Sequence, residues 1–176
     1  AFKDDDWNRF VRISVGGTWN AQPITIAGGV AMMRIIDEER GSIYPRLYSI
    51  GRRLTGSFND RAEDLGVAAI ASGLPPENPT LFSVTPLKEP IPPEKMHLWR
   101  EGAREMEDYA TMESFSAGAR ATYVNYLATA NSGVYPFPRG SYILCTKYSE
   151  EDLERTEAAF ELSLRSLIRN DAVGRI

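Results

Sequence analysis

The sequence predicts an α+β fold in which a small sheet carries helices on one face, and three observations support this prediction. Segments whose apolar residues recur with helical spacing alternate with short strand-like runs, in the order helix, strands, helices, strand, helix. Prolines and glycines divide these segments from one another. At 176 residues, with 43% hydrophobic and 25% charged residues, the chain has the composition of a globular protein with a core of its own. We therefore expect a sheet of about three or four strands.

The N-terminal part is expected to combine a strand, a glycine turn and an apolar helix. Apolar residues recur over residues 10–15, which predicts a short strand that leads into the turn. Pro23 suits the first turn of a helix, because its φ is preset and its missing N–H would have no partner there. The helix is expected to end at Glu39, before Gly41. Residues 24–36 are almost all apolar or glycine, which predicts a buried helix.

The remaining elements follow from apolar spacing and from residues that break helices and strands. Apolar residues between positions 44 and 58 fit a second helix. Four prolines between positions 86 and 93 exclude regular structure there. Ser149 and Asp152 form the pattern of a capping box at the start of the last helix. We expect strands over 66–71, 80–84 and 142–146, and helices over 94–108, over 115–130 and from 149 onward.

Charge and composition exclude several classes of function. The net charge of −4 at pH 7 argues against a broad nucleic-acid-binding surface. No apolar run reaches the roughly 18 residues of a membrane span, and the chain opens without a basic and then apolar secretory leader. The one cysteine, Cys145, allows no internal disulfide and is expected to be a small buried core residue. These features predict a cytoplasmic protein with neither a membrane nor a nucleic acid as partner.

The run GGTWNAQPITIAGGVAMM, residues 16–33, joins a polar glycine turn to the apolar helix. Backbone N–H groups and the Thr18 hydroxyl in such a turn can bind an anion. Composition alone favours the alternative, a glycine turn that lets a core helix pack. Gly28 and Gly29 lie inside the predicted helix, where close helix packing is the better explanation for them.

Two segments of the chain together resemble a known family. Residues 16–33 resemble the segment that class III pyridoxal-phosphate (PLP) aminotransferases carry after their lysine-bearing region, above all in the branch of glutamate-1-semialdehyde aminomutase. The runs NSGVYPFP, SYILCT and SEEDLERT, within residues 131–156, resemble the closing strand and helix of that family. The segments occur in the family's order and together bracket about residues 16–165. The ordered pair is more specific than either segment alone.

The resemblance implies a fold, a cofactor and partners. It places residues 1–41 at the C-terminal edge of the large PLP-binding domain of a fold-type I enzyme, and residues 42–176 in the small C-terminal α+β domain. It implies that Thr18, with Gly17 beside it, binds the phosphate of PLP in the neighbouring subunit across a dimer interface. The implied reaction is amino-group transfer on an amino acid or a semialdehyde, with a small-molecule amino donor and acceptor. The implied partner is a second copy of the chain or the missing large-domain portion.

The chain departs from the family at the residue that carries the cofactor. The family binds PLP covalently through a lysine that precedes the segment resembled by residues 16–33. Only Lys3 comes before Thr18, and it lies beside an acidic triplet rather than in a glycine-rich or apolar setting. We therefore expect the chain to be an incomplete fragment that is inactive alone, and we assign it no catalytic residue. The other lysines are Lys88, Lys95 and Lys147.

Two other classes of function stay open. A non-catalytic dimerisation or interaction module derived from this fold would use the same apolar helix and partner-facing turn. An unrelated small enzyme would use His97 as a general base among acidic neighbours. The setting of His97 is typical of a solvated helix face, which disfavours catalysis. The segment 74–112, which carries His97, is not obviously shared with the family.

Further polar residues have both a functional and a structural interpretation. Arg120 and Arg139 can bind a substrate carboxylate as a bidentate pair, although surface arginines are the commoner case. The acidic residues 150–152 suggest a metal site, but acids are also favoured in the first turn of a helix. No cluster of histidine, cysteine and acidic residues has the spacing of metal ligands, so we expect no metal site.

Overall fold

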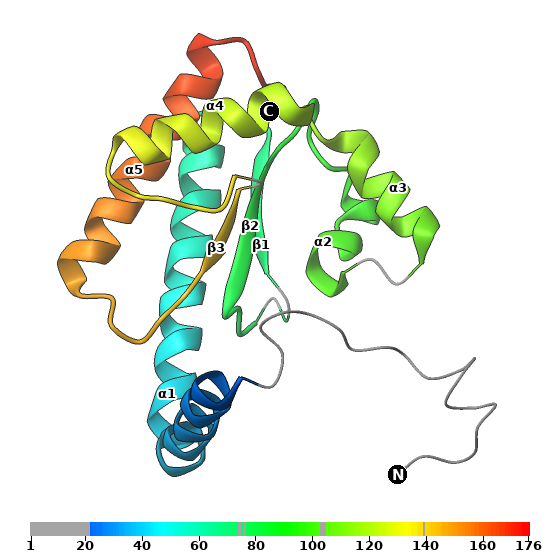
Figure 1. Ribbon diagram of the computed structural model, residues 1–176. Helices are drawn as coiled ribbons and strands as arrows, with labels where there is room; N and C mark the ends of the chain where they lie inside the picture. Colours follow the sequence, from blue (N-terminus) through cyan, green and yellow to red (C-terminus); the bar gives the residue numbers. More distant parts are fainter. Residues whose placement is uncertain (1–21, 74, 76, 103–104, 139) are drawn as a thin grey trace. The chain divides into compact units, whose positions relative to one another are not determined.

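The computed structural model describes residues 22–73, 75, 77–102, 105–138 and 140–176. The chain divides into two compact units, Ala1–Gly41 and Ser42–Ile176. The strand expected over residues 10–15 lies outside the described residues. Within the described ranges, no helix combines the length and the apolar content that crossing a membrane requires. The elements, shown in Figure 1, are α1 (Pro23–Asp64), β1 (Ala69–Gly73), β2 (Leu81–Pro86), η2 (Pro93–Lys95), α2 (His97–Glu101), α3 (Met106–Phe115), α4 (Gly118–Asn131), β3 (Ser141–Ile143) and α5 (Glu150–Arg169).

The second unit is built on a three-stranded antiparallel sheet in the order β1-β2-β3, which confirms the predicted α+β class. In this sheet Ala71 lies opposite Val84, and Phe82 lies opposite Tyr142. Because side chains alternate along a strand, Phe82, Val84 and Tyr142 share one face, and all three are buried. The rings of Phe82 and Tyr142 stack with their centroids 4.7 Å apart. This inner face of the sheet carries the main core.

Residues 42–64 of α1, together with α4 and α5, cover the inner face (Figure 1). From α1, Ile50, Leu54 and Phe58 are buried at intervals of four residues, which places them on one face of the helix. From α5, Phe160 stands edge-on to Phe58, with the ring centroids 5.3 Å apart. Burying one large apolar side chain contributes roughly 1.5 to 3 kcal/mol. The helical spacing of apolar residues therefore located the core helices correctly.

The helix that was expected to end at Glu39 continues through Gly41 and Pro45 to Asp64. Inside a helix, glycine costs about 1 kcal/mol and proline about 3 kcal/mol relative to alanine. Tertiary contacts offset these costs. Arg46 donates hydrogen bonds of 3.0 and 2.7 Å to two carbonyls of the loop before α5, and the next turns pack into the core. The two helices expected on either side of residue 41 are therefore one.

The charged helix expected over residues 94–108 is divided into η2, α2 and α3. Gly102 follows α2 with a φ of 83°, a left-handed conformation that favours glycine and ends the helix. A second hydrophobic cluster holds this region, in which Trp99 stands edge-on to Phe115 with ring centroids 5.8 Å apart. The helix expected over 115–130 is present as α4 and begins at Gly118. The strands expected over 66–71, 80–84 and 142–146 are present with shifted boundaries.

The capping box predicted for the last helix is confirmed. Asp152 Oδ2 accepts hydrogen bonds from the Ser149 hydroxyl at 2.7 Å and from the Ser149 N–H at 2.9 Å, and the Asp152 N–H donates to Ser149 Oγ at 3.1 Å. The bonds from Ser149 stabilise the carboxylate, so the pKa of Asp152 is lower than its usual value. This cap fixes the start of α5.

The free edge of β1 is closed by a side chain of α1. Asn59 Nδ2 donates to the Ala71 carbonyl at 3.1 Å, and Asn59 Oδ1 accepts from the Ala71 N–H at 2.8 Å. The amide thereby satisfies the two backbone groups that Ala71 turns away from β2. Asn59 protects this part of the edge from pairing with another chain.

Candidate functional site

The cofactor contacts predicted from the sequence, Gly17 and Thr18, lie outside the described residues, and so does Arg139. The structure describes the helix that follows the predicted turn. That helix begins at Pro23, where the sequence predicted it to begin. After Gln22, its side chains are the nearest described neighbours in sequence of the predicted phosphate contact.

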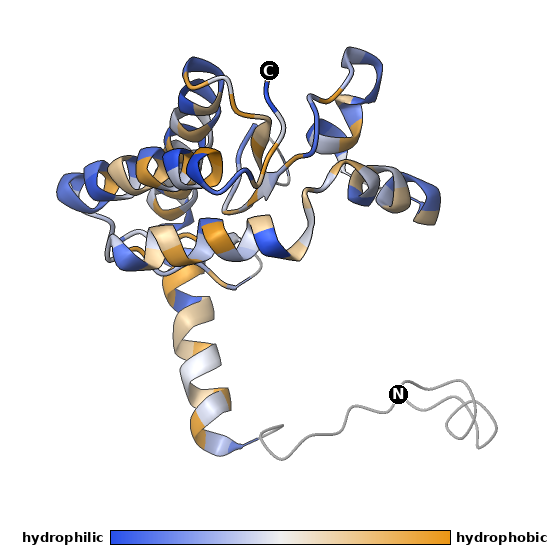
Figure 2. Cartoon of the chain, turned by 90° about the horizontal axis from the view of Figure 1, so that it is seen from above, coloured by the Kyte–Doolittle hydropathy of each residue, from blue (hydrophilic) through white to orange (hydrophobic). Residues whose placement is uncertain are grey.

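The first part of α1 carries exposed apolar side chains where a buried helix was expected. The exposed fraction is 80% for Ile24 and 66% for Met33, and Figure 2 shows the apolar colouring along these turns. In the described part of the unit Ala1–Gly41, this helix is the one regular element, so that unit has no second described element to cover it. An added Cβ at Gly28 or Gly29 would meet nothing within 4 Å. The close packing expected at these glycines is therefore not formed among the described residues.

One face of this segment is hollowed into a shallow groove. Residues three and four apart share a face of a helix, and the groove residues follow that spacing. Gly29 contributes no side chain, so the helix surface is lower there. A groove of this kind accepts the side-chain ridge of a packing partner. The lining residues are Ile26, Gly29, Val30, Met33, Arg34 and Asp37.

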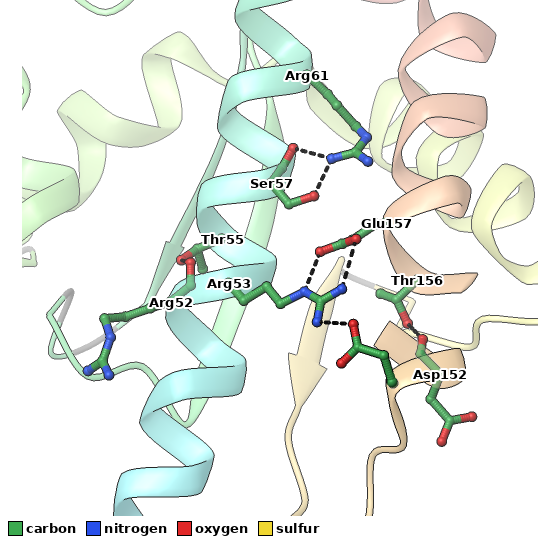
Figure 3. Close-up of polar contacts among 9 residues, drawn as sticks. Arg52, Arg53, Thr55, Ser57, Arg61, Asp152, Thr156 and Glu157 are labelled. Carbon is green, nitrogen blue, oxygen red and sulfur yellow. Dashed lines mark hydrogen bonds and ion pairs between the residues drawn. The ribbon is translucent and has the colours of Figure 1, made fainter. Parts of the chain in front are cut away.

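A charged cluster joins α1 to α5 (Figure 3). Arg53 donates to Glu157 at 2.7 and 3.2 Å and to Glu150 at 2.5 Å. The hydrogen bonds to Glu157 and Glu150 raise the pKa of Arg53, and the bond from Arg53 lowers the pKa of Glu157 below its usual value. Arg53 and Glu157 are therefore held in their charged forms at neutral pH. The cluster ties two helices together, which favours a structural role for it.

Two candidates from the sequence make local structural contacts. His97 is exposed, and its Nδ1 lies 2.8 Å from the carbonyl oxygen of Glu94. Arg120 donates to the carbonyl oxygen of Asn170 at 2.9 Å, which ties α4 to the end of α5. These contacts favour the structural interpretation of both residues over catalysis or carboxylate binding.

The expectation of a buried cysteine is wrong, because Cys145 is exposed. The strand that was expected to include it ends at Ile143, and buried Tyr142 and Leu144 alternate with exposed Ile143 and Cys145. The acidic residues 150–152 serve the cap of α5 and the bond to Arg53. Within the described ranges, no group of three or more metal-ligating side chains comes together.

A second groove lies on the outer face of the sheet. Ser72, Ser83 and Thr85 line it from the strands, and Trp99 and Glu113 line it from α2 and α3. Sequence reasoning missed this groove because the charged segment was expected to form a single solvated helix. The available signal was the strand LFSVTP, in which hydroxyl side chains alternate with buried apolar ones.

Comparison with known proteins gives a consistent set of relatives. No family model matches the chain. Over 156 residues the chain is 25% identical to the glutamate-1-semialdehyde 2,1-aminomutase of Methanopyrus kandleri, which covers 89% of this chain and 31% of the relative. A solved structure described as a transaminase with PLP bound superposes with a TM-score of 0.62 at 20% identity, covering 90% of this chain and 30% of the other. An omega-transaminase from Sphaerobacter thermophilus gives a TM-score of 0.56 at 20% identity, with 88% and 30% covered.

These similarities confirm the resemblance that the two sequence segments carry. The chain is similar to the aminomutase in sequence and to the transaminases in fold. It spans only about 30% of the length of the relatives that it matches.

Proposed function

We propose that this chain is the C-terminal part of a PLP-dependent aminotransferase or aminomutase that acts on an amino acid or a semialdehyde. The observation that carries the proposal is the match of 89% of this chain to 31% of a glutamate-1-semialdehyde aminomutase. In this proposal, residues 1–41 belong to the edge of the large domain, and residues 42–176 form the small domain. The division of the chain into units at Gly41 supports that assignment.

The proposed role of Thr18 is to bind the phosphate of PLP in the partner subunit. Gly17 beside it lets the backbone approach the phosphate closely. A hydroxyl and N–H groups near the start of a helix are suitable donors for phosphate oxygens, and α1 begins at Pro23, shortly after Thr18. When bound, PLP supplies an electron sink for chemistry at the carbon that bears the amino group. The task of this chain is to hold and orient the phosphate.

The described lysines do not fit the covalent attachment of PLP. Lys88 Nζ donates to the Ser114 carbonyl at 3.1 Å, and Lys95 Nζ lies 5.1 Å from the centre of the Phe115 ring. Lys147 is exposed. A lysine that reacts with a carbonyl group needs a lowered pKa, which burial or a neighbouring cation supplies. The reactive lysine is therefore proposed to come from outside these 176 residues, and the chain alone is proposed to be inactive.

The exposed apolar face of α1 supports the proposal of a larger assembly. Apolar side chains such as Ile24 and Met33 are stabilised by roughly 1.5 to 3 kcal/mol each when they are buried. The proposed cover is the rest of the large domain, in an enzyme that works as a dimer. A cytoplasmic location, as expected from the sequence, belongs to the same proposal.

The proposed phosphate contact is tested by PLP retention in an assembled enzyme that contains this chain and the lysine-bearing portion. Thr18→Ala removes the hydroxyl donor and is expected to weaken retention of PLP about tenfold. Thr18→Ser keeps the hydroxyl and is expected to retain PLP normally. Equal retention in all three forms would refute the assigned contact.

A second candidate function is a non-catalytic dimerisation or interaction module of the same fold. The exposed apolar face of α1 favours it, because such a face associates readily without any cofactor. In that case Met33→Glu abolishes association, and Thr18→Ala changes nothing. Turnover of an amino donor by the assembled enzyme rules this candidate out.

A further inference from the structure

The helix α1 extends from the first unit into the second, and its two parts are held differently. Between Pro23 and Pro45 none of its residues is buried. Directly after Pro45, Arg46 donates hydrogen bonds of 3.0 and 2.7 Å to two carbonyls of the loop before α5. The buried stripe that starts at Ile50 then packs the following turns into the core. The anchored part of α1 therefore begins at Arg46.

Gly41 and Pro45 weaken the same turn of α1. Pro45 has no N–H, so the hydrogen bond that this position would donate to the Gly41 carbonyl cannot form. The proline ring also crowds the carbonyl four residues earlier, and that carbonyl belongs to Gly41. Glycine has the widest backbone freedom of all residues. Sharp bends in long helices occur at proline and at glycine, so this turn is a suitable place for α1 to bend.

Packing does not account for either residue. Gly41 and Pro45 are both exposed, and an added Cβ at Gly41 would meet nothing within 4 Å. Gly51 is different, because an added Cβ there would collide with the backbone oxygen of Pro79. The boundary between the two compact units falls in the same turn, between Gly41 and Ser42. The weakened turn therefore coincides with the boundary between the units.

We propose that residues 41–45 form a hinge, at which the first part of α1 changes direction while Arg46 holds the second part in place. A hinge consists of a few residues that absorb a change in backbone angles between two parts that keep their structure. Bending here lets the exposed apolar face, which includes Ile24 and Met33, adjust its angle to the partner that covers it. The hinge is argued from the helix alone and requires neither PLP nor the proposed enzyme assignment.

The test measures the distribution of distances between two spin labels by pulsed electron paramagnetic resonance. One label is attached to the exposed Cys145, and the other to the thiol that Ala27→Cys supplies. The 176-residue chain also carries Met33→Glu and is measured where sedimentation shows it to be monomeric. Residue 27 lies about 21 Å from Gly41 along the helix, so a bend of about 20° moves it by about 7 Å. We expect the distances to spread over at least about 7 Å.

Pro45→Ala restores the N–H that the Gly41 carbonyl lacks, and it is expected to narrow the distribution about twofold. Gly56→Ala is the matched control, because it lies in the anchored part of α1, where an added Cβ also meets nothing within 4 Å. It is expected to leave the width unchanged. The circular dichroism spectrum of each variant checks its helix content.

A second pair of labels separates bending from fraying. Ala27→Cys and Arg40→Cys, in a chain that carries Cys145→Ser, place both labels before the hinge and about 20 Å apart along the helix. This pair is expected to give a narrow distribution.

Three results would overturn the proposal. The first is a narrow distribution between residue 27 and Cys145 in the chain that keeps Pro45. The second is a width that Pro45→Ala leaves unchanged, or that Gly56→Ala reduces equally. The third is a broad distribution for the pair at residues 27 and 40, which would place the motion outside residues 41–45. A failure of the PLP assignment would leave all of these measurements unaffected.

Discussion

Arg53 is the residue on which the polar contact between α1 and α5 depends. Its guanidinium binds both Glu157 and Glu150, and the side chain of Glu157 is only 16% exposed. The Glu157 carboxylate in that position is stabilised by the Arg53 guanidinium. If Arg53 were removed, water could not fully solvate this carboxylate. Removing Arg53 therefore leaves a charge without its partner, which costs more than the loss of an ordinary surface pair.

We expect Arg53→Met to lower the free energy of unfolding by about 1 to 2 kcal/mol at pH 7, measured by urea denaturation. The pKa of Glu157 is lower in the folded than in the unfolded chain. Its contribution is therefore complete above about pH 4.5, the unfolded value, and is lost as the pH falls through the folded pKa. The difference between the wild type and the variant should shrink in that acidic range.

Arg155→Met is the matched control for this prediction, because Arg155 forms an exposed pair with Glu151 on the same helix. Its loss is expected to change the free energy of unfolding by less than about 0.5 kcal/mol. A variant of Arg53 that behaves like this control, or whose deficit is the same at pH 3 as at pH 7, would contradict the role assigned to the cluster.

Single residues were predictable from the sequence where their contacts are local. Ser149 and Asp152 are three residues apart, so their reciprocal bonds follow from the spacing alone. Arg53 and Glu157 are more than a hundred residues apart in the sequence, and no local pattern around either residue predicts their contact. Cys145 was placed wrongly because the whole apolar run was read as buried, whereas Tyr142 and Leu144 point inward and the alternation turns Cys145 outward.

At the scale of elements, two glycines of α1 have different surroundings. An added Cβ at Gly56 would meet nothing within 4 Å, whereas one at Gly51 would collide with the backbone oxygen of Pro79. Gly51 is buried, and it lets the loop before β2 approach the helix closely. Gly56 makes no such close contact. The conformational entropy that its backbone loses on folding therefore lowers the stability without any compensating contact.

We expect Gly56→Ala to raise the free energy of unfolding by about 0.5 to 1 kcal/mol. Gly51→Ala should lower it by about 1 kcal/mol or more, because the loop or the helix has to shift. Denaturation of both variants under the same conditions measures the two effects. Effects of the same sign would show that the path of α1 past Pro79 is wrong.

The type of most elements was predictable, and their ends were not. The buried stripe from Ile50 to Ala62 follows the helical period, and that period is visible in the sequence. The continuation of α1 through Gly41 and Pro45 depends on contacts of Arg46 with a distant loop. Gly102 divides α2 from α3 because it takes a positive φ, and a glycine in a charged segment fits either a helix interior or its end.

At the scale of the whole molecule, the described residues leave a strongly apolar helix face uncovered. Neither the outer groove of the sheet nor this helix face could be predicted from a local sequence pattern. Such a pattern does not show which residues will pack against one another. The apolar sequence of the helix predicts burial but does not say what would cover it. The resemblance to aminotransferases supplies that cover, because it implies a missing large-domain portion. It supplied none for the groove, most of whose lining residues lie in the segment 74–112, which is not obviously shared with the family.

The chain in isolation is expected to self-associate through this helix face, seen as a concentration-dependent mass in sedimentation equilibrium. Met33→Glu places a charge on the face and should shift the equilibrium to the monomer. Met106→Glu changes a methionine of the second unit that is even more exposed, at 78%, and should leave the association unchanged. A chain that is monomeric at all concentrations, or a response to Met106→Glu alone, would contradict this use of the face.

The central claim is that these 176 residues complete a PLP enzyme whose reactive lysine lies elsewhere. The most direct measurement is the intact mass and PLP content of the protein isolated from its natural source, together with the coding sequence upstream of Ala1. We predict a larger polypeptide or a tight complex that carries PLP on a lysine in a glycine-rich segment preceding Thr18. A polypeptide limited to these 176 residues, without a companion chain and without PLP, would contradict the claim.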